Sequence, residues 1–194
     1  MFINYINIAY YIDIMAQSKK SERRVVSTNE SLYTVILLEI NVLLLPTQIG
    51  STKTKENLKS TITYFVEGKC INEGFVKPNS VNIKTYSSGA VKGEQIEFCV
   101  VFECKVCNPI EGTWINDCIV KSVTKAGIHA NAFDDNNNIP VTIFVIRDHF
   151  IDNDYFKEIK ENDSINVKVI GSRFELNDKH VEVIGNLMPK KRET

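Results

Sequence analysis

Five short runs of alternating apolar and polar residues occupy the second half of the chain, and they constrain its fold more than any other feature. In the fourth run, for example, Ile165 and Val167 alternate with Asn166. A period of two places every second side chain on the same face of a β-strand. Several short strands of this kind, separated by turn residues, predict a sandwich or a small barrel. The runs cover residues 114–123, 128–133, 141–146, 164–173 and 180–187.

The order of these runs favours a particular barrel. A helical segment is expected near the residues RDHF, at 147–150, between the third and fourth runs. Five strands with one such segment suggest a Greek-key barrel of the OB type. Gly127 stands where a barrel strand would bend or bulge. The residues DDNNN at 134–138 indicate a surface turn rather than a calcium loop, because the EF-hand spacing and its final Glu are absent.

An α+β arrangement is predicted for the first half, with a sheet and one packed helix. Residues 35–45 form an apolar strand that ends at Pro46 and is expected in the middle of a sheet. Leu58 and Ile62 lie at helical spacing within residues 53–66, and Gly68 is placed to end that helix. The remaining expected segments are strands at 74–76, 81–86 and 94–106, with a Gly-rich turn at 87–93.

Two cysteines in the long strand, Cys104 and Cys107, have the spacing of half a zinc site. Within a regular strand they point to opposite faces, whereas a zinc knuckle turns both thiolates inward and needs two more ligands. No other pair in the chain repeats this spacing. The sequence therefore favours a seam between two β structures over a metal site, and we expect no cofactor.

Composition limits the function classes. The chain has 194 residues and a formal net charge of -1, so no global positive field favours strong binding to bulk nucleic acid. Its five cysteines form an odd number without a framework, which indicates free thiols in a reducing compartment. No nucleophile elbow, phosphate-binding loop or metal-binding His pair is present, so we expect a protein that is not an enzyme.

The segment 1–31 reads as an extension and linker. Its apolar start, MFINYINIAYYIDIMA, is interrupted by Asn4, Asn7 and Asp13 and is shorter than a spanning helix requires. We therefore expect no membrane anchor. A flexible or helical extension, or a true start at Met15, are the alternatives. The basic residues of the linker could form a localisation signal or a basic arm, and a solvated linker is the alternative.

The order of motifs resembles a known family. INVLLLPTQIG, a helix, VEGKCINEGFV, a strand ending VVFECKVCNPIEG, and then IVKSVTKAGIHA are similar to the stalk subunit of multisubunit DNA-directed RNA polymerases. This is the seventh-subunit family of eukaryotes, called E-prime in archaea, and the composition looks more like the versions of large DNA viruses. The resemblance covers residues 32–188.

The resemblance implies an organisation and partners. Residues 32–109 would form a tip domain that docks on the polymerase core, residues 110–189 an OB barrel that faces nascent single-stranded RNA, and residues 190–194 a basic tail. The large polymerase subunits would be partners, and a fourth-subunit-like partner stays open. The protein would act inside the host cell, in cytoplasm or nucleus, with packaging in the virion left open. The implied docking residues are Pro46, Ile49, Gly50, Gly68, Cys70, Gly74, Phe75, Gly89 and Gly93.

An OB barrel binds single strands by stacking bases on aromatic side chains of its second and third strands, while cations guide the phosphates. Phe133 and Phe144 could instead pack on the helix or the first domain, and His129 could be an ordinary exposed residue. Packing is the favoured interpretation of Trp114, where barrel and tip meet. The candidate RNA-binding residues are Lys121, Lys125, His129, Asn131, Phe133, Phe144, Arg147 and Arg173.

The resemblance thus implies a non-catalytic polymerase stalk subunit that contacts nascent RNA during initiation and elongation. A free-standing OB-fold RNA-binding regulator, of translation for example, is the alternative. It would bind RNA without associating with a polymerase.

Overall fold

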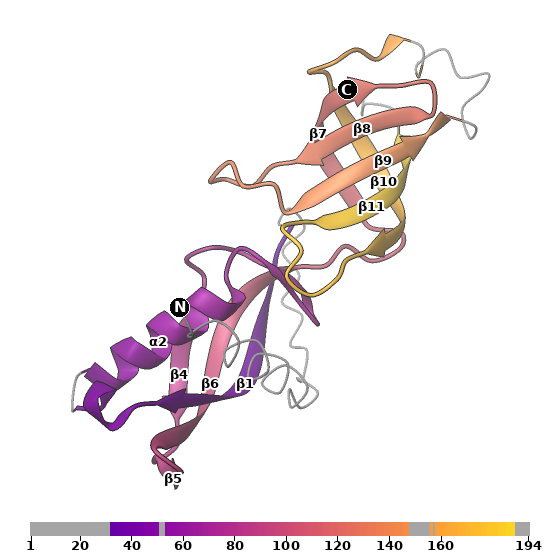
Figure 1. Ribbon diagram of the computed structural model, residues 1–194. Coiled ribbons are helices and arrows are strands. Elements are labelled where there is room, and N and C mark those ends of the chain that lie inside the picture. The colour runs from indigo at the N-terminus through magenta and orange to yellow at the C-terminus, as the bar shows by residue number, and fades with distance from the viewer. Residues whose placement is uncertain (1–31, 51–52, 148–155, 157, 189–194) are drawn as a thin grey trace.

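Two bodies lie end to end in the computed structural model, which gives the molecule an elongated shape (Figure 1). One body is a six-stranded sheet with a helix on it, and the other is a closed five-stranded barrel. The expected classes, a sheet with one packed helix followed by a five-stranded barrel, are confirmed at this level. The expected extension, the segment 148–150 and the basic tail lie outside the described residues. The structure describes residues 32–50, 53–147, 156 and 158–188.

The sheet is organised around one long strand, β6 (Gln95–Cys107), which pairs antiparallel with four others. β1 (Thr34–Leu44) runs beside it over its whole length, from Thr34 opposite Val106 to Leu44 opposite Ile96. The other three partners are β3 (Gly74–Val76), β4 (Asn82–Tyr86) and β5 (Ala90–Lys92), and β3 also pairs with β2 (Cys70–Ile71).

Two expectations for the sheet were wrong. β1 was expected in the middle of the sheet, but it lies at an edge, with β6 as its partner in the described part of the chain. Its inward face packs on the core, while Val35 and Leu37 on the other face are each 47% exposed. The apolar side chains on both faces of β1 therefore did not require a neighbouring strand along each of its two edges. The turn expected at 87–93 contains β5, which forms a tight hairpin with β6.

A 3-10 turn, η1 (Pro46–Gln48), leads from β1 to the helix α2 (Lys53–Val66), whose bounds match those predicted. Leu58 and Ile62, at the predicted spacing, are fully buried on the sheet. The Thr54 hydroxyl donates to the Gly50 carbonyl at 2.8 Å and ties the first turn to the chain before it. Gly68 has φ +71°, a conformation that favours glycine, and it ends the helix as expected.

The barrel follows the order β10-β11-β9-β8-β7 and closes through antiparallel pairing of β7 with β10. All neighbours are antiparallel except β9 and β11, which run parallel. Three of the predicted ranges agree with the strand bounds, and the other two are displaced by one residue. The strands are β7 (Trp114–Val123), β8 (Gly127–Ala132), β9 (Val141–Ile146), β10 (Ser164–Arg173) and β11 (Val181–Met188).

The two bodies are joined by backbone pairing as well as packing. The Cys70 N–H donates to the Asp178 carbonyl at 2.7 Å, and the Asn177 N–H donates to the Cys70 carbonyl at 2.9 Å. Cys70, Phe75 and Cys107 belong to the sheet yet are buried in the cluster of apolar side chains that fills the barrel. The core of the barrel therefore extends into the sheet body.

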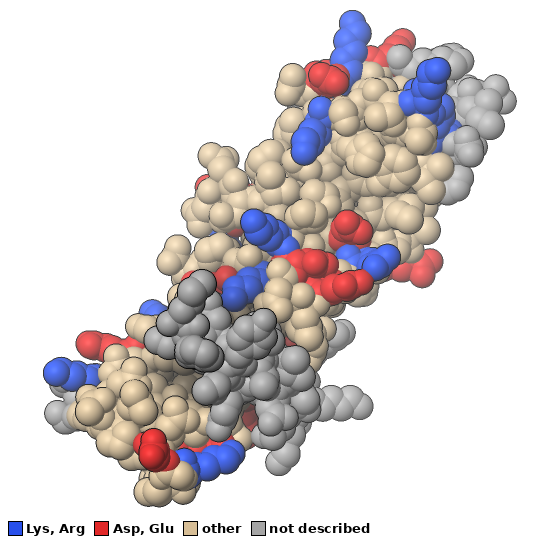
Figure 2. Space-filling view, in the orientation of Figure 1, with Lys and Arg blue, Asp and Glu red and all other residues tan. Residues whose placement is uncertain are grey.

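Polar contacts surround this junction, where acidic and basic side chains lie close together (Figure 2). The Tyr33 hydroxyl donates to Asp134 Oδ2 at 3.0 Å. Lys77 Nζ lies 3.9 Å from the same carboxylate and 4.9 Å from the centre of the Tyr33 ring. Asp134 begins the predicted turn at 134–138, and its Oδ1 accepts the N–H groups of Asn136 and Asn138 at 2.9 Å each. The turn is confirmed, but its first side chain is buried against the other body rather than solvated.

The cysteine pair that resembled half a zinc site lies at this junction. Cys104 is buried in the core of the sheet body, whereas Cys107 is buried in the cluster of the barrel. The two thiols therefore point to opposite sides of β6, as the strand pattern predicted. Among the residues that the structure describes, no group of three His, Cys, Asp or Glu side chains is placed to hold a metal ion.

Candidate nucleic-acid interface

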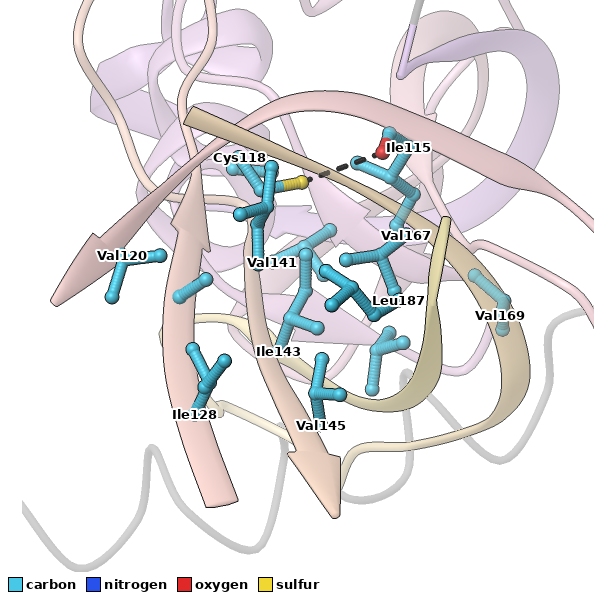
Figure 3. Close-up of a cluster of buried hydrophobic side chains, with 14 of the residues drawn as sticks. Ile115, Cys118, Val120, Ile128, Val141, Ile143, Val145, Val167, Val169 and Leu187 are labelled. Atoms are coloured by element: carbon cyan, nitrogen blue, oxygen red, sulfur yellow. Dashed lines mark hydrogen bonds between the residues drawn. The ribbon is translucent and has the colours of Figure 1, made fainter. Parts of the chain in front are cut away.

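The interior of the barrel is filled by its own side chains. Apolar residues from all five strands point inward and meet along the axis (Figure 3). Val120, Ile128 and Val145 are fully buried, and the Cys118 thiol donates to the Ile115 carbonyl at 3.5 Å. A filled barrel of this size binds through its outer surface.

An aromatic pair stands on that outer surface. His129 of β8 and Phe144 of β9 are directly opposite each other in the register, and their ring centroids are 4.6 Å apart. Their strand neighbours Ile128, Ala130 and Ile143 are buried, so the two rings point away from the core. The structure thus brings together two side chains that were predicted to stack on bases.

A glycine leaves room for this pair. A Cβ added at Gly127 would stand 3.0 Å from the tip of the Phe144 ring, so that ring lies over Gly127. Gly127 pairs with Ile146, two residues beyond Phe144, which places the ring diagonally across β8 between Gly127 and His129. The expected bend at Gly127 is therefore a close approach of strand and ring rather than a bulge, because the register of β8 and β9 is continuous there.

The same face continues onto β11. Ile184 is aligned with Phe144 in the parallel pair, and 44% of its surface is exposed. We call His129 and Phe144, together with the apolar side chain of Ile184 beside them, the aromatic row. Ile184 was not among the predicted site residues. Its signal in the sequence was an apolar residue on the face of the last run that otherwise carries Glu182.

Two predicted cations lie at the end of the barrel that is distant from the sheet body. Arg147 follows β9, and its Nη2 donates to the Thr124 carbonyl at 2.9 Å. Its guanidinium also lies 5.4 Å from the centre of the Phe156 ring. Lys125 is exposed in the β7–β8 turn that carries Thr124. The cations and the aromatic row therefore meet at one end of the face.

The other predicted RNA-binding residues are more scattered. Lys121 is exposed at an irregularity of β7, between the pairs made by Val120 and Ser122. Asn131 and Phe133 lie farther along the β8 side, toward the junction, and Phe133 is 41% exposed rather than packed away.

Arg173 is at the junction end of the barrel, and its Nη2 lies 2.7 Å from Glu175 Oε1. The hydrogen bond and charge of Glu175, together with the charge of Glu182, raise the pKa of Arg173. This cation is thus accompanied by acids, and in the β10–β11 register it is opposite Glu182, two residues before Ile184 of the aromatic row.

Charge is sparse on the face itself. The outer side of β8, β9 and β11 faces the viewer in Figures 1 and 2, and most of its atoms belong to neither acidic nor basic residues. Such a surface suits uncharged, flat groups such as bases, with phosphates guided from the rim.

Trp114, at the start of β7, is 48% exposed, so the expected close packing of this ring was wrong.

The predicted docking residues fall into two places. The turn Pro46–Gly50 follows the end of β1, and Gly89 and Gly93 flank β5. These segments lie together because Leu44 and Val91 both pair with Ile96 of β6. We call this end, distant from the barrel, the free tip (Figure 1).

The remaining predicted docking residues are near the opposite end of the sheet. Cys70, Gly74 and Phe75 are buried, two of them in the cluster of the barrel, and Gly68 is partly buried nearby. A Cβ at Gly74 would stand 2.5 Å from the Cys107 carbonyl, so this segment is shaped by the junction. Its side chains are therefore occupied within the chain.

No helix in the described part of the chain is long and apolar enough to cross a membrane. Comparison of the sequence with models of protein families and with curated proteins finds no match.

Proposed function

We propose that this chain is a non-catalytic stalk subunit of a DNA-directed RNA polymerase, which docks through its free tip and contacts nascent RNA with its barrel. The observation that carries the RNA-binding part is the aromatic row on the outer face, with Lys125 and Arg147 at its end. The ordered motifs that resemble the stalk family support the polymerase part.

The topology supports an OB-type identity for the barrel, which is part of this proposal. Its third and fifth strands are parallel neighbours, and its first strand pairs with both the second and the fourth. This order agrees with a Greek-key barrel of the OB type, in which the second and third strands present the binding face. His129 and Phe144 stand on those two strands.

The expected affinity for RNA is moderate. Each base stacked on an aromatic side chain contributes about 1–3 kcal/mol, and few cations are available for phosphates. The stalk would therefore hold RNA with the help of the polymerase, which keeps the transcript near. This expectation agrees with the net charge of -1.

The RNA-binding part is tested by fluorescence anisotropy of the full chain with a labelled single-stranded RNA of about 12 nucleotides. Phe144→Ala should weaken binding about 10-fold, because one stacking platform is lost. Tyr64→Ala is the control, since it removes an exposed ring from α2 of the sheet body, outside the barrel. Equal affinities of the wild type and Phe144→Ala would contradict the proposed binding face.

The alternative, a free-standing RNA-binding regulator, shares the same barrel face. It predicts the same effect of Phe144→Ala but no association with polymerase subunits. The exposed free tip favours the stalk: Val91, the middle residue of β5, is 82% exposed, and Leu45 beside η1 is 47% exposed. Apolar side chains that project from a tip are suited to insertion into a partner.

A further inference from the structure

A second row of outward side chains crosses the same face beside the aromatic row. Asn131 of β8 is opposite Thr142 of β9, and Glu182 of β11 is aligned with Thr142 on its other side. Their strand neighbours Ala132, Ile143 and Val181 are buried, so these three side chains also point outward. We call Asn131, Thr142 and Glu182 the polar row.

The distance between the two rows is similar to the width of a nucleic-acid base. They are two residues apart along each strand, which is about 7 Å. The Phe144 ring leans over Gly127, away from Thr142, and so leaves the polar row uncovered. Within the described part of the chain, no side-chain hydrogen bond ties Asn131, Thr142 or Glu182 to another residue. A base that stacks on Phe144 can therefore extend its edge over the polar row.

The position of Glu182 indicates which part of RNA lies there. A carboxylate repels phosphate, and the one cation opposite Glu182 in the β10–β11 register, Arg173, is itself 2.7 Å from Glu175 Oε1. Two acids thus accompany one cation here, which favours a base edge over the backbone beside the stacking platform. The cations Lys125 and Arg147 are at the opposite side of the aromatic row, where phosphates are attracted. The face is thus divided into a rim for phosphates, a row for stacking and a row for edges.

We infer that the polar row selects bases that carry an exocyclic amino group, adenine and cytosine for example, over uracil; this inference rests on the proposed RNA-binding function. The Glu182 carboxylate only accepts hydrogen bonds, and amino groups donate them. Asn131 offers both a donor and an acceptor, the combination with which asparagine side chains bind adenine in protein–DNA complexes. Uracil presents two carbonyl oxygens beside its single N–H, and these oxygens are repelled by the carboxylate.

The test compares labelled oligoadenylate, oligocytidylate and oligouridylate of about 12 nucleotides with the full-length protein by fluorescence anisotropy. The first two should bind about 10-fold more tightly than the third, the discrimination of one good base contact. Glu182→Gln should bring the three affinities within about 2-fold of one another, because an amide also donates to uracil carbonyls.

Glu175→Gln is the matched control, since it removes the same charge beside Arg173 but outside the polar row. It should leave the preference unchanged. Equal wild-type affinities for the three RNAs would overturn the inference. So would a Glu182→Gln variant that binds all three more tightly by the same factor, because the carboxylate would then act only through its charge.

Phe144→Ala separates this inference from the function on which it rests. Weaker binding of all three RNAs by Phe144→Ala, together with an unchanged preference in Glu182→Gln, overturns the selection of bases and leaves RNA binding supported. Undiminished binding by Phe144→Ala, or no binding by the wild type, overturns both.

Discussion

At the scale of single residues, Asp134 ties the barrel to the sheet body through several polar contacts. Its side chain is 2% exposed, accepts from Tyr33 and from three groups of the turn, and lies near Lys77. Burial acts to raise the pKa of Asp134, but the hydrogen bonds from Asn138, Asn136 and Tyr33 outweigh it and lower this pKa. Burial and the hydrogen bond to Asp134 raise the pKa of Tyr33.

Removal of this carboxylate should loosen the junction. Asp134→Ala removes the carboxylate that accepts from the partly buried Tyr33 hydroxyl and from the turn N–H groups, which should cost about 1–3 kcal/mol in the free energy of unfolding. Urea denaturation followed by circular dichroism measures this loss. Asp135→Ala is the control, since the side chain of Asp135 is 98% exposed, and it should change the stability by less than about 0.5 kcal/mol. Equal effects of the two substitutions would argue against this role.

The same residue predicts a dependence on pH. Because the folded-state pKa of Asp134 is below its unfolded value of about 3.9, its ionisation stabilises the fold above that pH. This contribution is lost as the pH falls through the folded-state pKa. Asp134→Asn should therefore lose less stability than the wild type when the pH is lowered from about 5 to about 2. Parallel curves of stability against pH for the two proteins would exclude this contribution.

The cysteines should differ in reactivity. Burial raises the pKa of Cys70, Cys104, Cys107 and Cys118 to about 12 each, whereas Cys99 is partly exposed. Since the thiolate is the reactive form, iodoacetamide at neutral pH should modify Cys99 first, and all five thiols only after unfolding. Peptide mass spectrometry identifies the modified residues. Rapid modification of Cys104 or Cys107 in the native protein would contradict their assignment to the two cores.

At the scale of elements, the approach of β8 to β9 depends on Gly127. A Cβ there would stand 2.1 Å from the Val145 carbonyl, so backbone would have to move. The same substitution would press on the Phe144 ring. The aromatic row and the strand pairing thus depend on one small residue.

Gly127→Ala should therefore destabilise the barrel and, together with it, weaken the RNA binding that we propose. The expected loss is about 1–3 kcal/mol, as for other overpacked sites, and thermal unfolding measures it. Gly171→Ala in β10 is the matched control, because a Cβ there meets nothing within 4 Å. A Gly127→Ala protein as stable as Gly171→Ala would show that the strands do not approach as described.

The bounds of most elements were predictable, because burial of one face of a strand or helix makes apolar residues recur at regular intervals in the sequence. The alternation in 164–173 and the helical spacing of Leu58 and Ile62 reflect contacts within one element and its core. The edge position of β1 could not be predicted, since the same apolar pattern arises when one face is covered and the other is exposed.

The candidate site was predictable only in part, for the same reason. His129 and Phe144 were identified from strand parity, but their contact depends on the register between β8 and β9. The burial of Cys70 and Phe75 depends on how the barrel meets β6, which no local pattern records. Arg173 looked like a rim cation because its proximity to Glu175 arises only when the β10–β11 turn folds.

At the scale of the whole molecule, the protein is a rod with a different surface at each end. The free tip projects Val91 and Leu45, the junction is tied by backbone pairing and by Asp134, and the barrel presents the aromatic row. A rigid junction would hold the barrel at a defined distance from the partner that binds the free tip. This is the mechanical requirement of a stalk.

The central claim is tested most directly by affinity purification of the tagged full-length chain from the cells that produce it, followed by mass spectrometry. The two largest subunits of an RNA polymerase should be recovered with the wild type. They should be lost with Val91→Asp at the free tip, a variant that should retain its RNA binding, and kept with Phe144→Ala. Their absence from the wild-type sample would contradict the proposal that this chain is a polymerase stalk subunit.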